Sequence, residues 1–206
     1  MSKVKASILL SILFLFGMTS PVQSNVLLIS KAEIQKVVGD FPAHGSDEEL
    51  LDDMILLDYQ DTRTDAECKS AAAQSNDTSL KKLYGDLLTK YEASVLSVKL
   101  LRVAAIAGAN TAIAKKMYSR DRPYDRNGEI KPCIEEESSK SYPSGHTTIA
   151  RLFARVLSLR FPKREAAFMK RANEIAAYRV IGGVHHPSDV EAGKRLGDYL
   201  AKKFYK

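Results

Sequence analysis

Apolar residues recur along most of the chain at spacings of three and four positions, which is the period of an amphipathic α-helix. The alternating pattern of a half-buried strand is hard to find beyond the first 24 residues. Ser46 and Glu49, three residues apart, resemble a capping box that opens the first helix. We therefore expect an all-α, single-domain helical bundle. The predicted helices cover residues 46–57, 65–74, 79–88, 91–118, 147–160, 164–180 and 187–204.

The first 24 residues have the pattern of a secretory signal peptide. Lys3 and Lys5 precede an apolar run over residues 6–18, and small residues follow before the expected cleavage site. The run is short for a membrane span, so we predict removal rather than retention as an anchor, which stays the alternative. The catalytic domain would then be residues 25–206, located in the periplasm or secreted.

A second apolar stretch, residues 95–114, is interrupted by Lys99, Arg102 and Asn110. Charged side chains at the middle of a membrane span would be costly, so a core helix is the preferred interpretation. We therefore expect no stable membrane insertion after the signal peptide is removed.

Composition and charge narrow the choice of partners. The chain has 206 residues and 45% apolar content, enough for one domain with a sizeable core. Loss of Lys3 and Lys5 lowers the formal net charge from +6 to +4, which favours anionic small molecules without identifying one. The basic residues are scattered and lack interleaved aromatic residues, so nucleic acid is only a weak alternative.

The two cysteines, Cys68 and Cys133, would be free to pair in an oxidising compartment. The sequence alone leaves open whether they form a disulfide or remain two buried thiols. Two cysteines without clustered histidines make a structural zinc site improbable, and we expect no metal.

Residues 120–143 contain three prolines and an Asn127-Gly128 pair, and they show little periodicity. This pattern predicts a long loop. Long loops in compact domains often border functional sites, so chemistry is expected at both ends of this one.

At the start of the loop, Lys115 and Arg122 are seven residues apart and would share a face if the helix continued. Both cations could then bind one anion, since a guanidinium presents a planar fork to phosphate and an ammonium a compact charge. Alone, a basic helix end is more often a solvated surface.

At the end of the loop, Ser144, Gly145 and His146 precede an apolar-periodic helix. Ser144 is a plausible cap, and Gly145 lets the backbone approach a ligand closely. A helix N-terminus with free amides is a ready anion site, beside which His146 could give or take a proton. An ordinary cap with a surface histidine is the simpler alternative.

A third cluster follows the helix ending near residue 180. Arg179, His185 and Asp189 fall within eleven residues, and a Gly182-Gly183 pair separates two helices. A carboxylate four residues after a histidine can fix its tautomer and stabilise its positive charge. Together, the cationic pair, the helix terminus, an acid-base histidine and a carboxylate-backed histidine match the needs of phosphoryl transfer.

These three motifs resemble the tripartite signature of the type-2 phosphatidic acid phosphatase superfamily. The order and internal spacing agree: Lys, six residues, Arg-Pro; Pro-Ser-Gly-His; and Arg, five residues, His, three residues, Asp. One departure is Tyr178, where the signature commonly has Ser. The superfamily includes bacterial class A nonspecific acid phosphatases and vanadium haloperoxidases, and the short exported chain is most similar to the acid phosphatases, including residues 42–61.

The resemblance implies the helical fold shared by acid phosphatases and vanadium haloperoxidases. It also implies that the protein is an acid phosphatase that needs neither a metal ion nor another cofactor. His185, oriented by Asp189, would attack phosphorus and form a phosphohistidine. His146 would protonate the leaving group and then activate water, giving a bell-shaped pH profile with an acid-side optimum. The residues that would bind the phosphate oxygens are Lys115, Arg122, Ser144, Gly145 and Arg179.

Several alternatives stay open. His186 could be the nucleophile, although it lies three positions before Asp189, whereas the histidine of the family signature lies four positions before the Asp. Substrates could be small organic phosphate esters, lipid phosphates or nucleoside di- and triphosphates, the protein could bind phosphate without turnover, and it could form homo-oligomers. The residues interpreted as solvated or structural are Lys116, Arg120, Arg126 and His44.

Overall fold

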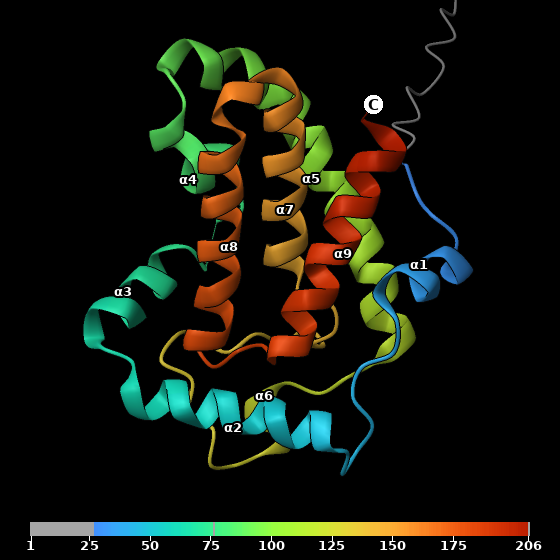
Figure 1. Ribbon diagram of the computed structural model, residues 1–206, viewed down its shortest axis with the longest axis vertical. Helices are drawn as coiled ribbons and strands as arrows, with labels where there is room; N and C mark the ends of the chain where they lie inside the picture. The colour runs from blue at the N-terminus through green and yellow to red at the C-terminus, as the bar shows by residue number, and fades with distance from the viewer. Residues whose placement is uncertain (1–26, 76, 206) are drawn as a thin grey trace, which may run out of the picture.

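The computed structural model describes residues 27–75 and 77–205, and every regular element within these ranges is a helix (Figure 1). The all-α prediction is confirmed, whereas the predicted signal peptide lies outside the described residues. Short 3-10 turns occur at Gly85–Leu87 and Pro162–Arg164. The helices are α1 (Lys31–Val38), α2 (Asp47–Thr62), α3 (Asp65–Ala73), α4 (Leu80–Tyr84), α5 (Lys90–Tyr118), α6 (Pro123–Arg126), α7 (Gly145–Arg160), α8 (Glu165–Ile181) and α9 (Pro187–Phe204).

Helix α7 is the centre of the bundle, with α5, α8 and α9 packed against it (Figure 1). Its apolar side chains point in several directions, and Leu152, Phe153 and Leu157 are all buried. A helix that is apolar around most of its circumference is stable only when neighbours cover it. The ends of α5 and α8 and the starts of α7 and α9 consequently meet at one end of the bundle, the lower end in Figure 1.

Two glycines allow α9 to approach α7 closely. A Cβ atom at Gly193 would lie 2.7 Å from the carbonyl oxygen of Ser144, and one at Gly197 would lie 2.9 Å from that of Thr148. Larger residues would therefore push the helices apart. The close approach brings the starts of the two helices together, and the Ser144 amide donates a hydrogen bond to the Asp189 carbonyl oxygen at 3.0 Å.

Helix α2 lies across the end of the bundle where the three motifs meet (Figure 1). Ser46 caps it as expected, since its hydroxyl accepts a hydrogen bond from the Glu49 amide at 3.2 Å. The capping box is only half formed, however. The Glu49 carboxylate accepts from the Gly45 amide at 2.7 Å and pairs with Arg126 at 2.7 Å, so α6 draws it away from the Ser46 backbone.

The predicted helix boundaries hold to within a residue or two for most elements, but two helices were missed. Helix α1, capped reciprocally by Ser30 and Glu33, has eight residues, too few to show a clear period. Helix α6 has four residues and begins at Pro123, so it interrupts the segment predicted as one long loop.

Cys68 of α3 and Cys133 of the segment between α6 and α7 form a disulfide, with Cα atoms 5.7 Å apart. The amide of Cys133 also donates to the carbonyl oxygen of Gly182 at 3.1 Å. This decides the pairing that the sequence left open. The bridge attaches α3 to a segment that lies against the turn after α8.

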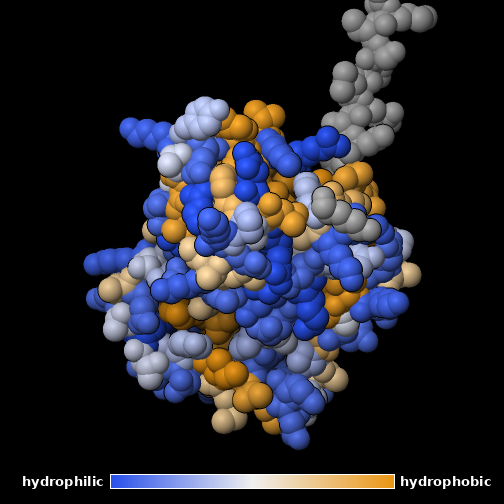
Figure 2. Space-filling model, turned by 45° about the horizontal axis from the view of Figure 1, so that its top comes forward, coloured by the Kyte–Doolittle hydropathy of each residue, from blue (hydrophilic) through white to orange (hydrophobic). Residues whose placement is uncertain are grey.

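Helix α5 meets the expectation of a core helix on one face only. Leu100, Val103 and Ile106 are buried, while Val98 and Leu101 are exposed. Among the described helices, the stretch Lys90–Arg126 is long and apolar enough to cross a membrane, by length and composition only. The core helix of a soluble protein can have the same length and composition. Figure 2 shows small apolar patches separated by hydrophilic residues on the face turned to the viewer.

Candidate active site

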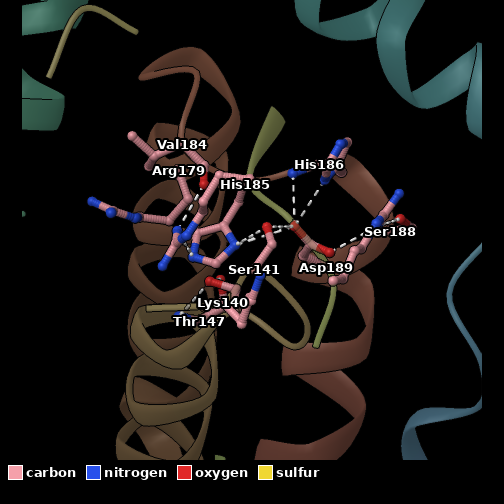
Figure 3. A network of polar contacts seen from close by, with 12 residues as sticks. Lys140, Ser141, Thr147, Arg179, Val184, His185, His186, Ser188 and Asp189 are labelled. Carbon is pink, nitrogen blue, oxygen red and sulfur yellow. Dashed lines mark hydrogen bonds and ion pairs between the residues drawn. The ribbon is translucent and has the colours of Figure 1, made fainter. Parts of the chain in front are cut away.

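The turn after α8 places Arg179 and His185 side by side. Gly182 ends the helix, and Gly183 adopts a left-handed conformation with φ +78°. The chain then folds back, so the carbonyl oxygen of Arg179 accepts hydrogen bonds from the amides of Val184 and His185, both at 3.2 Å. A glycine suits this position because an L side chain rarely adopts such a φ value. Figure 3 shows the two side chains next to each other.

The imidazole of His185 is completely buried and contacts a different group at each nitrogen. Its Nδ1 lies 3.2 Å from the Asp189 carboxylate, and its Nε2 lies 3.0 Å from Nη1 of Arg122. A carboxylate accepts and a guanidinium donates, so the neutral ring carries its proton on Nδ1 and has a lone pair on Nε2. Burial and the Arg122 charge hold the pKa of His185 well below its ordinary value. The ring is therefore neutral, the state that a nucleophile requires.

Asp189 remains ionised although no part of it is exposed. Burial opposes its charge, but hydrogen bonds from His185 and His186 outweigh that effect and keep its pKa well below the usual range. The His186 amide donates to the carboxylate at 2.9 Å, and the Ser141 hydroxyl donates to the same oxygen (Figure 3). A fixed negative charge here can stabilise a positive charge that develops on His185.

Arg120, interpreted from the sequence as a solvated residue, is in fact buried. Its Nη1 donates to the other oxygen of Asp189 at 2.7 Å, and its Nη2 donates to Asp52 of α2 at 3.0 Å. Its guanidinium also lies over the ring of Phe41, 5.1 Å from the centroid. The left-handed residue Ser119 ends α5 and turns the chain inward, which sequence spacing does not reveal. Arg120 therefore compensates two buried carboxylates.

Lys115 and Arg122 converge, although not in the way the spacing suggested. Helix α5 ends at Tyr118, and Arg122 is the N-cap of α6, so the two residues do not share one helix face. They meet at Ser139, whose hydroxyl lies 3.4 Å from Nζ of Lys115 and 3.0 Å from Nη2 of Arg122. Burial, together with the charge of Arg122, lowers the pKa of Lys115 to about 7.

The second motif forms the start of α7, as predicted. Ser144 is the N-cap, and its hydroxyl accepts from the hydroxyl of Thr147 at 2.9 Å. The nearest protein atom to a Cβ built at Gly145 lies 3.6 Å away, on Thr111, which is an ordinary contact. This contact does not require a glycine at position 145, and the approach of a ligand to its backbone stays a prediction.

His146 follows with its ring turned toward the cations. Its Nε2 lies 2.7 Å from the carbonyl oxygen of Ser75, which can only accept, so Nε2 carries the proton of the neutral ring and Nδ1 is free. The hydroxyl of Ser75 in turn accepts from Arg179 at 2.8 Å. Burial and the Arg179 charge lower the pKa of His146 to about 4.

Glu137 is the unexpected member of the site. Its carboxylate pairs with Arg122 at 2.6 Å, forms a second ion pair with Arg179, and lies 3.9 Å from Nδ1 of His146. Both arginines are almost fully buried. The pKa of Glu137 falls to about 2, because burial, which would raise it, is outweighed by the charges of Arg179 and Arg122. The run of three glutamates at 135–137 was the only sequence signal for it.

His186, the alternative nucleophile, faces elsewhere. Its Nδ1 lies 3.2 Å from the Asp189 carboxylate, as that of His185 does, but its Nε2 lies 3.3 Å from Arg126. Arg126 itself is held by Glu49 and Asp53 of α2, so it is not a freely solvated residue. The Nε2 atom of His186 therefore has α6 and α2 as its neighbours, whereas that of His185 has Arg122.

The remaining candidates lie at the surface. The side chain of His44 is 94% exposed, in agreement with its interpretation as a surface residue, and Lys116 is exposed as well. Among residues 27–75 and 77–205, no group of three or more His, Cys, Asp or Glu side chains is placed to hold a metal ion. The expectation of metal-independent chemistry stays a prediction.

A model of the PAP2 superfamily matches residues 96–206, the part of the chain that contains all three motifs. The chain belongs to the PAP2 superfamily. Among curated relatives, it is 43% identical over 91 residues to a non-specific acid phosphatase of Salmonella typhi, covering 42% of this chain and 36% of that protein. It is 35% identical over 117 residues to a non-specific acid phosphatase of Providencia stuartii, covering 54% and 47%.

A lipid A 1-phosphatase of Rhizobium etli is 30% identical over 112 residues, covering 52% of this chain and 48% of the relative. The chain thus spans less than half the length of these three curated relatives. A solved structure of a transmembrane PAP2 type phosphatidylglycerolphosphate phosphatase from Bacillus subtilis is similar with a TM-score of 0.60 at 22% identity, covering 78% of this chain and 87% of that one. A bacterial vanadium-dependent iodoperoxidase has a TM-score of 0.55 at 16% identity, covering 81% and 52%. These likenesses confirm the predicted fold.

Replacing Arg120 by Ala should strongly destabilise the protein. The change leaves the buried carboxylates of Asp52 and Asp189 without their shared counter-charge, and breaking a buried pair costs about 3–5 kcal/mol of unfolding free energy. Denaturant unfolding measures the loss. Lys116→Ala removes the same charge from an exposed position of the same motif and should change stability by less than about 0.5 kcal/mol. Equal, small effects of both variants would show that Arg120 has no such role.

Inorganic phosphate should raise the pKa of His146. The free protein has a value of about 4, and an anion beside Nδ1 would favour the charged ring. Without phosphate, the folded protein binds fewer protons than the unfolded chain between about pH 6.5 and 4, so its stability should decrease as the pH is lowered through this range. Titration of the ring signals by NMR, with exposed His44 as an internal control, measures the pKa, and denaturant unfolding at a series of pH values measures the stability. A pKa of His146 that phosphate leaves unchanged would contradict the assigned position.

Proposed function

We propose that the chain is an acid phosphatase, a metal-independent phosphomonoesterase that forms a phosphohistidine on His185. The observation that supports this best is the state of that ring. It is neutral and buried, Asp189 holds its Nδ1 proton, and its Nε2 lone pair lies beside Arg122. This is the arrangement of an activated nucleophile next to an anion-binding group.

The phosphate oxygens would be held by Lys115, Arg122 and Arg179. Each guanidinium already binds a carboxylate oxygen of Glu137, which has the charge and hydrogen-bonding geometry that a phosphate oxygen would offer. At the start of α7, the Gly145 amide and the Ser144 hydroxyl would add hydrogen bonds, and the helix dipole would be favourable. Three cations and these two groups would neutralise charge as the phosphoryl group transfers.

In the first half-reaction, Nε2 of His185 attacks phosphorus, the N–P bond forms, and the bond from phosphorus to the ester oxygen breaks. Asp189 stabilises the ring, which becomes positive. His146, protonated once the anion is bound, gives the proton on Nδ1 to the departing alkoxide. This atom is suited to the task because Nε2 is held by the Ser75 carbonyl oxygen.

In the second half-reaction, the neutral His146 takes a proton from water through Nδ1. The resulting hydroxide attacks phosphorus, the N–P bond breaks, and inorganic phosphate leaves with His185 restored. The low pKa of His146 supports an acid-side optimum, because the proton donor is charged only at acid pH in the free protein.

The entrance favours small monoesters over the alternatives. A hollow of about 320 Å³ borders the site, and the described residues that line it are all Ser or Glu: Ser75, Glu135, Glu136, Glu137, Ser138 and Ser139. The glutamates repel a nucleoside triphosphate, which carries several further negative charges. The mostly polar lining also offers little apolar surface for an acyl chain. These properties favour a small phosphate ester with a neutral leaving group.

We also propose that the protein is exported. The signal-like sequence of residues 1–24 supports this, and so does the disulfide between Cys68 and Cys133. Disulfides persist in oxidising compartments such as the periplasm. The acid phosphatase relatives are in keeping with such a location.

The proposal is tested by hydrolysis of p-nitrophenyl phosphate in the presence of a chelator. We expect turnover at acid pH, and rapid quenching with ³²P-labelled substrate should trap acid-labile phosphoprotein. His185→Ala should abolish trapping and lower kcat by at least about 10³-fold, because it removes the nucleophile.

The matched control is His186→Ala, which removes an adjacent buried imidazole that contacts the same carboxylate. Label should still be trapped in this variant. Trapping that survives in His185→Ala and disappears in His186→Ala would identify His186 as the nucleophile and contradict the proposal. Absence of turnover at every pH would instead favour a phosphate-binding protein.

A further inference from the structure

The phosphate site of this chain is already occupied by the protein itself. The Glu137 carboxylate places one oxygen on Arg122 at 2.6 Å and the other on Arg179, and it lies 3.9 Å from His146. These are the groups that the proposed function assigns to the phosphate. A carboxylate and a phosphoryl group compete for the same N–H donors of the two guanidinium groups, so both cannot be bound there at once.

The residues that follow Glu137 bind the third cation of the site, Lys115. Nζ of Lys115 donates to the carbonyl oxygen of Lys140 and lies 3.4 Å from the Ser139 hydroxyl. The Nε atom of Arg122 donates to the Ser139 carbonyl oxygen at 2.7 Å. Residues 137–140 therefore supply oxygens to all the cations of the site, and we call them the plug segment.

The physical need for such an anion follows from the burial of the cations. Arg122 and Arg179 are 1% and 2% exposed, and Lys115 lies close enough to Arg122 for that charge to lower its pKa. Like charges in a poorly solvated site repel one another unless an anion compensates them. Glu137 supplies that compensation when phosphate is absent.

One hydroxyl binds the backbone of Glu137 on both sides. Tyr124 of α6 donates its hydroxyl hydrogen to the Glu137 carbonyl oxygen at 3.0 Å and accepts from the Glu137 amide at 2.9 Å. The Glu137 side chain is nevertheless 27% exposed at the hollow, so solvent lies next to it. Turning the side chain outward would free both arginines without unfolding a helix.

We infer that Glu137 is an internal competitor for the phosphate site and sets its affinity for phosphate esters and for inorganic phosphate. The inference rests on the proposed function, since it concerns the same site. A substrate must displace the carboxylate, so its apparent affinity equals the affinity of the open site multiplied by the fraction of molecules in which the site is open. The same carboxylate returns as the product leaves, which limits inhibition by inorganic phosphate.

The test is calorimetric titration of the full chain with inorganic phosphate. Glu137→Gln keeps the shape of the side chain and removes its charge, and we expect phosphate to bind at least about tenfold more tightly, the effect of losing one charge-assisted competing contact. Inhibition of p-nitrophenyl phosphate hydrolysis by phosphate should strengthen in parallel. The control Glu129→Gln removes the same charge from the same connecting segment, at an exposed position, and should change affinity less than about twofold.

A second variant keeps every charge in place. Tyr124→Phe removes the hydroxyl that holds the Glu137 backbone, so it should also tighten phosphate binding, even if Glu137→Gln folds poorly. Thermal unfolding with saturating phosphate shows whether each variant is folded.

The possible outcomes separate the two claims. Equal or weaker phosphate binding by both variants, with turnover retained by the unmodified protein, would overturn the inference alone. Tighter binding by the variants without turnover by the unmodified protein would contradict the proposed function and support the inference. Absence of phosphate binding in all of these proteins would contradict both.

Discussion

The carboxylate of Asp189 is completely buried, and it keeps its charge because donors from several parts of the chain reach it. Arg120 comes from the turn after α5, Ser141 from the segment before α7, and His185 and the His186 amide from the turn between α8 and α9. An uncompensated charge in this position would cost several kcal/mol, on the order of the stability of a whole domain. The segments that carry the three motifs must therefore fold together, and the packing of α7 against α9 holds them there.

The sequence carried enough information for most of the fold because its helices have clear apolar periods. The stretch predicted at 187–204 agrees with α9 at both ends, and that predicted at 91–118 differs from α5 by one residue. The apolar period does not reveal the positions at which a local backbone conformation ends a helix. The left-handed Ser119 ends α5 before Arg122, so a spacing of seven residues did not place that side chain on the helix face of Lys115.

Those parts of the site whose members lie close together in the sequence could be predicted from their spacing. His185 and Asp189 meet through one turn, and Ser144 caps α7 as its position before an apolar helix indicated. Arg120 and Glu137 were missed because their partners lie far away in the chain, and a charged residue without a local partner is usually solvated. Burial is what gives them roles: Arg120 compensates carboxylates beneath the site, and Glu137 compensates cations within it.

In the proposed function, the three motifs surround one oxyanion with His185 as the nucleophile. A crystal structure of the protein with bound vanadate is the decisive test, because vanadate adopts the geometry of a phosphoryl group under attack. We expect vanadium bonded to Nε2 of His185, with its oxygens on Lys115, Arg122 and Arg179 and with Glu137 displaced. Vanadate bound to His186, or bound elsewhere while Glu137 stays on the arginines, would contradict it.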